Sequence, residues 1–238
     1  MNKNSGVNHS VVRNGRYTRS QIKNIERHNE RKNEVYTNPD VHLEESNFNI
    51  HFKRPTNSYI NTFDEMCDKG IISTKGLKAD AVHFDELLFD VNTLYFEKHG
   101  GYEFAAGFFE QVYQFAIEEV GGEQYILSAV MHADELNTEV SKKLGKDVYH
   151  YHLHVVYVPT VQKEVKWTKR CKDKDLIGTV KEVITQVSHS KKWASHNEIG
   201  EDRKPHLVKS YSLLQDRFSQ YVNSLGYDDI SRGERGST

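Results

Sequence analysis

The chain has 238 residues, of which 37% are hydrophobic and 28% charged, and this length suits one substantial domain with a buried core. Its formal net charge of −2 indicates no class of partner by itself. Residues 1–15 lack the apolar run of a signal peptide, no segment approaches the ~20 apolar residues of a membrane span, and Cys67 and Cys171 are too far apart in sequence for a CxxC pair. We therefore expect a protein of the cytoplasm, a reducing compartment.

The first half of the chain is predicted to alternate strands and helices. Apolar residues at every second position indicate strands, and apolar residues three or four positions apart indicate helices. Val7–Arg13 is a predicted strand that ends in a turn at Asn14-Gly15, and Thr18 is the predicted N-cap of the helix after it. The other expected strands are 47–52 and 80–91, and the expected helices are 18–32, 59–69, 92–98 and 103–119.

The second half combines two more strands with a helical C-terminal part. The expected strands are 124–133 and 148–159, with a polar loop between them and a short extension at 161–168, and the expected helices are 174–194 and 207–225. These elements predict an α+β fold in which an antiparallel sheet of about five strands is flanked by helices. We expect residues 1–160 to form the core, and the basic segment and C-terminal helices of residues 161–238 to pack on the same domain.

Positive charge is concentrated in two segments. Residues 1–32 contain eight lysines and arginines against two acidic residues, and residues 163–174 contain six against two. Such local excess on a nearly neutral chain suits a polyanion-binding site. The alternative is that both segments are solvated faces without a partner, and charge alone leaves both open.

The strongest chemical signal is a run of alternating histidines, His150, His152 and His154, in the strand expected at 148–159. Side chains two residues apart on a strand share a face, and neutral imidazoles so placed can bind one divalent cation. His132 ends the preceding strand and is the natural third ligand, and the acidic residues that follow it can orient an imidazole or bind metal. The alternative is a set of ordinary polar residues on a half-exposed strand.

An open metal site of this kind acts as a Lewis acid on a phosphoryl oxygen, which leaves a nucleophile to be found. The serines and cysteines lie in no recognisable motif, and glycine-rich phosphate loops are absent from the sequence. The other distinctive segment is Arg-His-Asn-Glu-Arg at residues 27–31, within the first basic segment. Taken alone, it fits an exposed polar helix end better than a catalytic motif.

Together these segments resemble the Mob/Pre plasmid mobilisation relaxases, also called MobV, of the HUH endonuclease superfamily. The resemblance rests on blocks that follow the family's order: His28–Arg31, Ser46–Asn49, Lys78–Val82 with Asp85-Glu86, His132–Glu135, His152–His154 with Pro159, and Leu214–Asp216. It covers nearly the whole chain, which is similar to the N-terminal catalytic domain of longer relaxases. It implies an HUH relaxase-like fold whose catalytic core is residues 1–160.

Two features depart from the family's pattern. Residues 136–151 form a longer insertion where the family has a short Thr-Pro link, and Tyr151 stands where proline is usual. Ile50 replaces a tyrosine that is often found in the second block, which strengthens the case for a histidine nucleophile. The insertion lets His150 compete as a ligand, but the spacing to Pro159 favours the two histidines after it.

The resemblance implies metal-assisted DNA strand transfer at an origin of transfer. A divalent cation, Mn²⁺ or Mg²⁺, would be held by His132, His152 and His154 and would polarise the scissile phosphate. His28 would attack that phosphate and form a phosphohistidine link to the 5′ DNA end.

Three charged residues are expected to assist the nucleophile. Glu135 is the first choice to fix the tautomer of the His28 ring, with Asp134 or Glu30 as substitutes. Arg31 lies three residues after His28, hence on the same face of the predicted helix, and would hold the scissile phosphate.

The expected partner is DNA, recognised partly as a hairpin and partly as a single strand. The residues expected to contact it are Arg13, Arg16, Arg19, Lys23, Arg27, Lys78, Lys166, Trp167, Lys169 and Arg170. Contacts with the transfer machinery are expected from a region beyond Thr238, and no membrane contact is expected from this domain.

Other functions fit part of this pattern. A replication initiator or transposase of the HUH type usually uses tyrosine, and no Tyr-x-x-x-Tyr or Tyr-x-x-Lys motif occurs on a late helix. A non-enzymatic, metal-stabilised DNA-binding module would bind DNA without nicking it. A metallohydrolase of small phosphoesters is disfavoured by the two basic segments.

Overall fold

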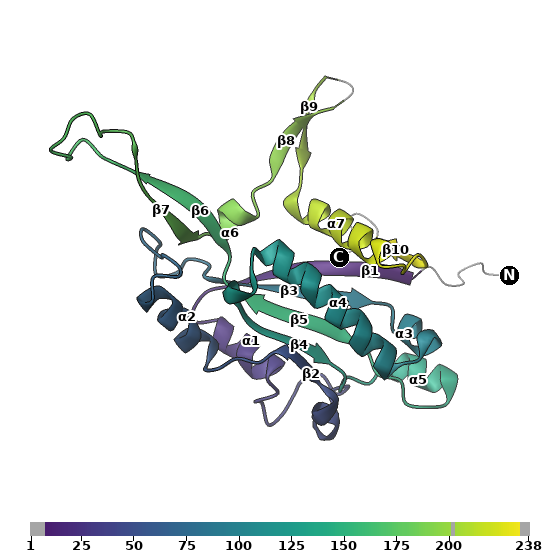
Figure 1. The fold of residues 1–238 in the computed structure, drawn as a ribbon. Coiled ribbons are helices and arrows are strands. Elements are labelled where there is room, and N and C mark those ends of the chain that lie inside the picture. Colours follow the sequence, from purple (N-terminus) through teal and green to yellow (C-terminus); the bar gives the residue numbers. More distant parts are fainter. Residues whose placement is uncertain (1–7, 201–202, 234–238) are drawn as a thin grey trace.

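A six-stranded sheet forms the centre of the fold in the computed structural model, which describes residues 8–200 and 203–233 (Figure 1). The order is β10-β1-β3-β5-β4-β2, and the strands span Asn8–Tyr17 (β1), Ile50–Lys53 (β2), Phe84–Val91 (β3), Ile126–His132 (β4), His152–Tyr157 (β5) and Ile230–Arg232 (β10). β10 pairs with β1 in parallel, and the other neighbours are antiparallel. The expected α+β class is thus confirmed; Val7, the first residue of the predicted first strand, lies outside the described residues.

Helices cover both faces of this sheet. They span Ile22–Asn29 (α1), Tyr59–Asp68 (α2), Thr93–His99 (α3), Tyr102–Val120 (α4), Thr138–Leu144 (α5), His189–Lys192 (α6) and Ser210–Ser224 (α7), and 3-10 turns span Leu43–Phe48 and Glu123–Tyr125. The helices expected at 59–69, 92–98 and 103–119 are confirmed as α2, α3 and α4. None of the helices in residues 8–200 and 203–233 is long and apolar enough to cross a membrane.

The two faces of the sheet have different covers, and side-chain alternation separates them. Phe89 on β3 packs against Phe115 of α4 and Phe218 of α7, with ring centroids 6.0 and 5.0 Å apart. The preceding residue, Leu88, points the opposite way and lies across from His154 of β5. We call the side of Phe89 the core face and the side of His154 the histidine face.

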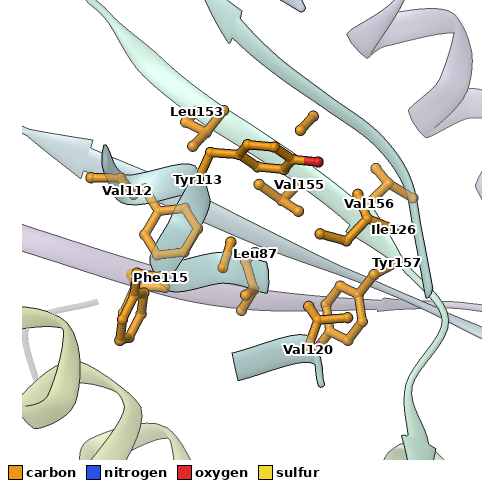
Figure 2. Close-up of a cluster of buried hydrophobic side chains, with 14 of the residues drawn as sticks. Leu87, Val112, Tyr113, Phe115, Val120, Ile126, Leu153, Val155, Val156 and Tyr157 are labelled. Atoms are coloured by element: carbon orange, nitrogen blue, oxygen red, sulfur yellow. The ribbon is translucent and has the colours of Figure 1, made fainter. Parts of the chain in front are cut away.

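The core face makes the sheet a rigid platform. Leu153, Val155 and Tyr157 of β5 are fully buried there and meet apolar side chains of α4 such as Val112 and Phe115 (Figure 2). Burial of apolar surface at about 25 cal/mol per Å² is the main stabilising contribution to such a layer. Because the strands are held from behind, the polar side chains on the histidine face keep fixed spacings.

The histidine face is covered by α1 and α2, which are joined to each other at Glu26. This carboxylate accepts hydrogen bonds from the backbone N–H of Tyr59, at the start of α2, and from the Lys32 ammonium group, at 3.0 and 2.6 Å. Ile22 is fully buried at the start of α1. These contacts fix the helix that carries His28.

The predicted turn at Asn14-Gly15 is wrong, because β1 continues through it to Tyr17. Both residues pair with β3, Asn14 with Leu87 and Gly15 with Glu86, so cross-strand pairing overrides local turn propensity. The following helix is shorter than expected: it begins at Ile22 rather than Thr18 and ends at Asn29 rather than Lys32. The strand expected at 47–52 begins only at Ile50, since the residues before it form a 3-10 turn.

The helix predicted at 174–194 is also wrong. This segment forms β7 (Val180–Val187), which pairs with β6 (Thr160–Lys166), and only the short α6 follows. The β-branched residues of β7 favour a pleated strand once a partner strand is available. We call Thr160–Val187 the arm; it extends away from the sheet, as does the smaller hairpin of β8 (His196–Ile199) and β9 (Pro205–Val208) (Figure 1).

The insertion between β4 and β5 contains a helix where a polar loop was expected. α5 begins after Asn137, whose side chain accepts a hydrogen bond from the backbone N–H of Val140, an N-cap. It ends at Gly145, which has φ +68°, a left-handed conformation that glycine adopts without strain. Of the helical C-terminal part, α7 is confirmed and packs beside β1 and β10 (Figure 1).

Candidate functional site

The three histidines predicted as metal ligands meet on the histidine face. His132 at the end of β4 lies directly across from His152 of β5, and His154 is two residues further along the same strand. The ring centroids are 5.2 Å apart for His132 and His152, 4.6 Å for His132 and His154, and 4.9 Å for His152 and His154. All three side chains are buried. The structure thus brings together the three histidines that the sequence singled out, and their role as metal ligands remains a prediction.

Each of these rings has one buried nitrogen without a hydrogen-bond partner: Nδ1 of His132, Nδ1 of His152 and Nε2 of His154. The other nitrogen of His132 donates to the backbone carbonyl of Asn29 at 3.0 Å, and that of His154 donates to the Glu86 carboxylate at 2.8 Å. Metal-binding histidines characteristically donate their second nitrogen in this way, which fixes the tautomer and aims the free lone pair. The donor set therefore fits a divalent cation.

Burial keeps the ligand histidines neutral. It lowers the pKa of His132 and of His152 well below the usual value, and the neighbouring His154 lowers both further. A neutral imidazole is the form that binds a metal ion.

Glu86 is a site residue that the sequence analysis quoted but gave no role. It lies on β3, next to β5, the strand that carries His152 and His154, and is 6% exposed. Besides His154, its carboxylate accepts hydrogen bonds from the Asn29 amide and the Tyr17 hydroxyl at 2.7 and 2.9 Å. Burial would raise its pKa, but His154 and these donors outweigh burial and lower it, so Glu86 is held as a carboxylate.

His28 lies beside the cluster, as expected for a reacting group. Its ring centroid is 5.6 Å from that of His132 and 5.7 Å from that of His154. Burial lowers the pKa of His28, and His154 and Arg31 lower it further, so the ring is neutral at neutral pH. Nitrogens of His28, His132 and His154 lie within 4.8 Å of one another, so geometry alone also allows His28 to be a ligand.

Glu135 faces the metal ligands rather than the His28 ring. One of its carboxylate oxygens lies 3.8 Å from Nε2 of His152 and 3.9 Å from Nδ1 of His132, and the three residues form a second candidate donor set. Its hydrogen bond is to Arg31, at 2.8 Å. These contacts favour metal binding over the expected orientation of His28.

Arg31 does not share a helix face with His28, because α1 ends at Asn29 and Arg31 has a left-handed backbone with φ 48°. Its side chain is 6% exposed, and the guanidinium donates two hydrogen bonds of 2.6 and 2.8 Å to the carboxylate of the fully buried Asp134. Burial would raise the pKa of Asp134, but Arg31 outweighs it and lowers that pKa. Arg31 thus ties the end of α1 to the acidic loop after β4, and the phosphate-holding role remains a prediction.

The two substitutes for Glu135 have other partners. Asp134 also accepts hydrogen bonds from the side chains of Ser46 and Asn49, at 2.7 and 2.8 Å. Glu30 accepts from Tyr59, Ser128 and His51, at 2.6, 2.7 and 2.8 Å. Both carboxylates therefore brace α1 and the loop at 41–49 against the sheet.

The residues expected to contact DNA fall in two areas. Arg13, Arg16, Lys23, Arg27 and Lys78 are at least partly exposed on β1, on α1 and in the loop before β3, and Lys166, Lys169 and Arg170 are exposed on the arm. Two of the expected contacts have protein partners: Arg19 forms a two-bond ion pair with Asp64 at 2.6 and 2.8 Å, and Trp167 lies under the Lys181 ammonium group.

A sheet with a buried histidine cluster on one face, and a helix that brings a further histidine to it, is the architecture expected from the sequence for a relaxase-like domain. The chain belongs to the Mob_Pre family of plasmid recombination enzymes, whose model matches residues 7–206. The resemblance to Mob/Pre relaxases is thus confirmed.

Two curated relatives are also plasmid recombination enzymes. The type 1 enzyme of Staphylococcus aureus is 26% identical over 229 residues, which make up 95% of this chain and 45% of that protein. The enzyme of a Bacillus species is 25% identical over 230 residues, 96% of this chain and 43% of that protein. The chain therefore spans less than half the length of these relatives.

The fold is similar to solved structures of the MobM relaxase domain, a MOBV protein bound to plasmid oriT DNA. One Mn-bound crystal structure matches with a TM-score of 0.63 and 19% identity, covering 96% of this chain and 92% of that chain. Another, with 26 nucleotides of oriT DNA, matches with a TM-score of 0.58 and 17% identity, covering 96% and 93%. The matches show that this chain has the fold of a relaxase domain.

Proposed function

We propose that this chain is a relaxase that nicks one DNA strand at an origin of transfer, with a divalent cation as cofactor and His28 as nucleophile. The observation that carries the proposal is the meeting of His28 with buried histidines, each of which has one ring nitrogen without a hydrogen-bond partner. Membership in the plasmid recombination enzyme family supports the same activity. The MobM domain, which shares the fold, is Mn-bound and in complex with oriT DNA.

His132, His152 and His154 would hold the cation, with Glu135 as a fourth ligand. Three imidazoles and one carboxylate do not select Mn²⁺ or Mg²⁺ over other divalent cations. The availability of the metal therefore decides which one is bound. When bound, the cation withdraws charge from the scissile phosphate and makes its phosphorus more electrophilic.

His28 is assigned as nucleophile rather than ligand for a structural reason. His132 and His154 each donate one nitrogen to a buried acceptor, as ligands do, and both stand on the rigid sheet. His28 comes instead from α1, on the open side of the cluster, and its lowered pKa supplies a neutral ring. A neutral imidazole nitrogen has the lone pair that a nucleophile needs.

In the reaction, a nitrogen of His28 forms a bond to phosphorus while the bond from phosphorus to the 3′ oxygen breaks. The released oxygen takes a proton and becomes a 3′ hydroxyl, and the other DNA end remains attached to His28 through its 5′ phosphate. The phosphohistidine bond retains the energy needed to rejoin the strand later. Arg31 and Asp134 keep the end of α1, and hence His28, at the cluster.

Exposed cations on α1, β1 and the arm would bind the DNA backbone, with Trp167 available to stack an unpaired base.

The proposal is tested with supercoiled plasmid that carries the origin cognate to this chain. Relaxation of the plasmid with Mn²⁺, and none with a chelator, is expected. DNA binding without relaxation would instead identify a non-enzymatic DNA-binding module.

A further inference from the structure

A cavity of about 490 Å³ opens on the histidine face, beside the metal ligands. It is bounded by the ends of β1 and β3, the start of α3, the insertion helix α5 and His150; its polar lining includes His9, Asp90, Asn92, Thr93, Asn137 and His150. A volume of this size holds a small organic group. Residues of the insertion at 136–151 therefore form one wall of this cavity, and none of the proposed metal ligands lines it.

The cavity is adjacent to the candidate active site. Asp90 in its wall is the cross-strand partner of the metal ligand His152, and the rings of His150 and His152 are 5.2 Å apart. A second cavity of about 300 Å³ shares Asn137 and His150 with the first and has Glu135 in its wall. A DNA strand whose phosphate binds at the histidine cluster can therefore place a neighbouring nucleotide at this cavity.

A chain of hydrogen bonds connects Asn137 to the ring of His150. The Asn137 amide donates to the Thr93 hydroxyl at 2.9 Å, so that hydroxyl is free to donate to Nδ1 of His150, at 2.8 Å. When Nδ1 accepts this bond, Nε2 carries a proton. Nε2 lies 3.5 Å from a carboxylate oxygen of Asp90, too far for a good hydrogen bond.

The cavity thus presents one donor, Nε2–H of His150, next to one acceptor, the Asp90 carboxylate. Nucleobases carry an adjacent donor and acceptor on their hydrogen-bonding edges. The apolar side chains of Val11, Leu94 and Val140 complete the wall and suit the flat faces of a base. Negative charge in the walls of the two cavities, at Asp90 and Glu139 for example, disfavours a phosphate group there.

We propose that this cavity binds one unpaired nucleobase of the DNA strand, next to the scissile phosphate, and that His150 and Asp90 contact its edge. The proposal deepens the proposed function and rests on it for placing DNA on this face. The two residues would be positioning and specificity residues, since they contact a base and not the reacting atoms.

The test uses mononucleotides as probes and needs no nicking. Mg²⁺-loaded protein is dialysed to equilibrium against each of the four 2′-deoxynucleoside 5′-monophosphates and against 2-deoxyribose 5-phosphate, which lacks a base. At least one nucleotide should bind about tenfold or more tightly than the sugar phosphate, a typical effect of one good base contact. His150→Ala and Asp90→Asn should each remove most of that preference, and His196→Ala, on the exposed β8–β9 hairpin, should preserve it.

Equal binding of all four nucleotides and the sugar phosphate would overturn the proposal, as would a preference that survives both substitutions. Asp90→Asn keeps the size of the side chain, so it remains informative if His150→Ala fails to fold. Nucleotide preference in a protein that never relaxes its plasmid would reject the nicking activity and leave the base cavity standing.

Discussion

The histidine face and the arm both carry residues with proposed functions, but they differ in burial. His132 is 0% exposed and His154 7%, whereas Lys166, Lys169 and Arg170 of the arm are exposed to solvent. Bond making needs groups at fixed distances in a water-poor site, where their interactions are strongest. Tracking a DNA backbone needs long, solvated cations that adapt to the phosphates.

The two regions also differ in how their side chains are supported. On the histidine face, Asn29 and Glu86 accept buried hydrogen bonds from His132 and His154, and Arg31 donates to the backbone carbonyl of His28. On the arm, Trp167 has a cation–π contact with Lys181, with the ammonium nitrogen 5.0 Å from the ring centroid. Substitutions on the histidine face should therefore have large effects on chemistry, and those on the arm small, graded effects on DNA binding.

The largest effect is expected for His28→Ala. Loss of the attacking nitrogen should lower the nicking rate by about 10⁴-fold or more, as for nucleophiles in other enzymes that form covalent intermediates. Binding to origin DNA should change by only a few fold, because the ring is one contact among many. Nicking assays and Mn²⁺-dependent melting test this together: loss of the metal-dependent stabilisation would make His28 a ligand instead.

His154→Ala should abolish the stabilisation by metal. A cation that binds only the folded state adds about 2.7 kcal/mol at a hundredfold excess over its Kd. Melting curves with and without Mn²⁺ measure this gain, and His152→Ala should behave alike. His150→Ala is the matched control and should keep the gain; an equal loss there would show that the ligands are misassigned.

Glu135→Gln distinguishes a ligand from an orienting residue. If Glu135 binds the cation, metal affinity and nicking rate fall together, and added Mn²⁺ restores much of the rate. The loss should be at least the roughly 10- to 100-fold typical of residues that only support ligands. A lower rate at unchanged metal affinity, measured across a Mn²⁺ titration, would return Glu135 to the role of orienting His28.

Glu86 and Asp85 are adjacent carboxylates on opposite faces of β3, and they provide a matched pair. Glu86→Gln should weaken metal binding by about 10- to 100-fold, because His154 loses its charged partner. Asp85 instead accepts from His189 and Trp193 on the core side, at 2.8 and 2.9 Å. Asp85→Asn should lower the free energy of unfolding by about 1–3 kcal/mol and leave metal affinity unchanged; metal titrations and denaturation curves that give the reverse would contradict this separation of the faces.

The smallest effect is expected on the arm. The double substitution Lys169→Ala and Arg170→Ala should reduce the slope of log affinity against log salt by about 0.9 for each DNA phosphate that the arm no longer neutralises. The nicking rate of saturated protein should not change. Lys98→Ala on α3 is the control for charge alone, and an equal change of slope there would mean that the arm has no special part in DNA binding.

The sequence revealed the chemistry of the histidine face better than the form of the arm. Alternation at His152 and His154 fixes which face they share, so their meeting with His132 needed only a correct strand assignment. The contact between Glu86 and His154 depends on the register between β3 and β5. The alternation of side chains within one strand does not predict how two strands are aligned. The second half of the arm was predicted as part of a helix at 174–194, and only pairing with β6 makes β7 a strand.

The position of the Arg31 side chain was also not predictable from local sequence. Its distance of three residues from His28 predicted a shared helix face, but the helix ends at Asn29 and the chain turns through a left-handed residue. The turn places the guanidinium on Asp134, 103 residues further along the chain. Such long-range ion pairs leave no local signal in the sequence.

The central claim, a covalent bond from His28 to DNA, is tested most directly by intact-mass analysis of the protein after incubation with Mn²⁺ and an oligonucleotide that spans the cognate nick site. We predict a mass increase equal to the 5′-phosphorylated downstream fragment less one water. Peptide mapping should place the fragment on His28, and mild acid should release it, as expected of a phosphorus–nitrogen bond. Nicked DNA without any adduct, or an adduct on a tyrosine or serine, would contradict a histidine nucleophile.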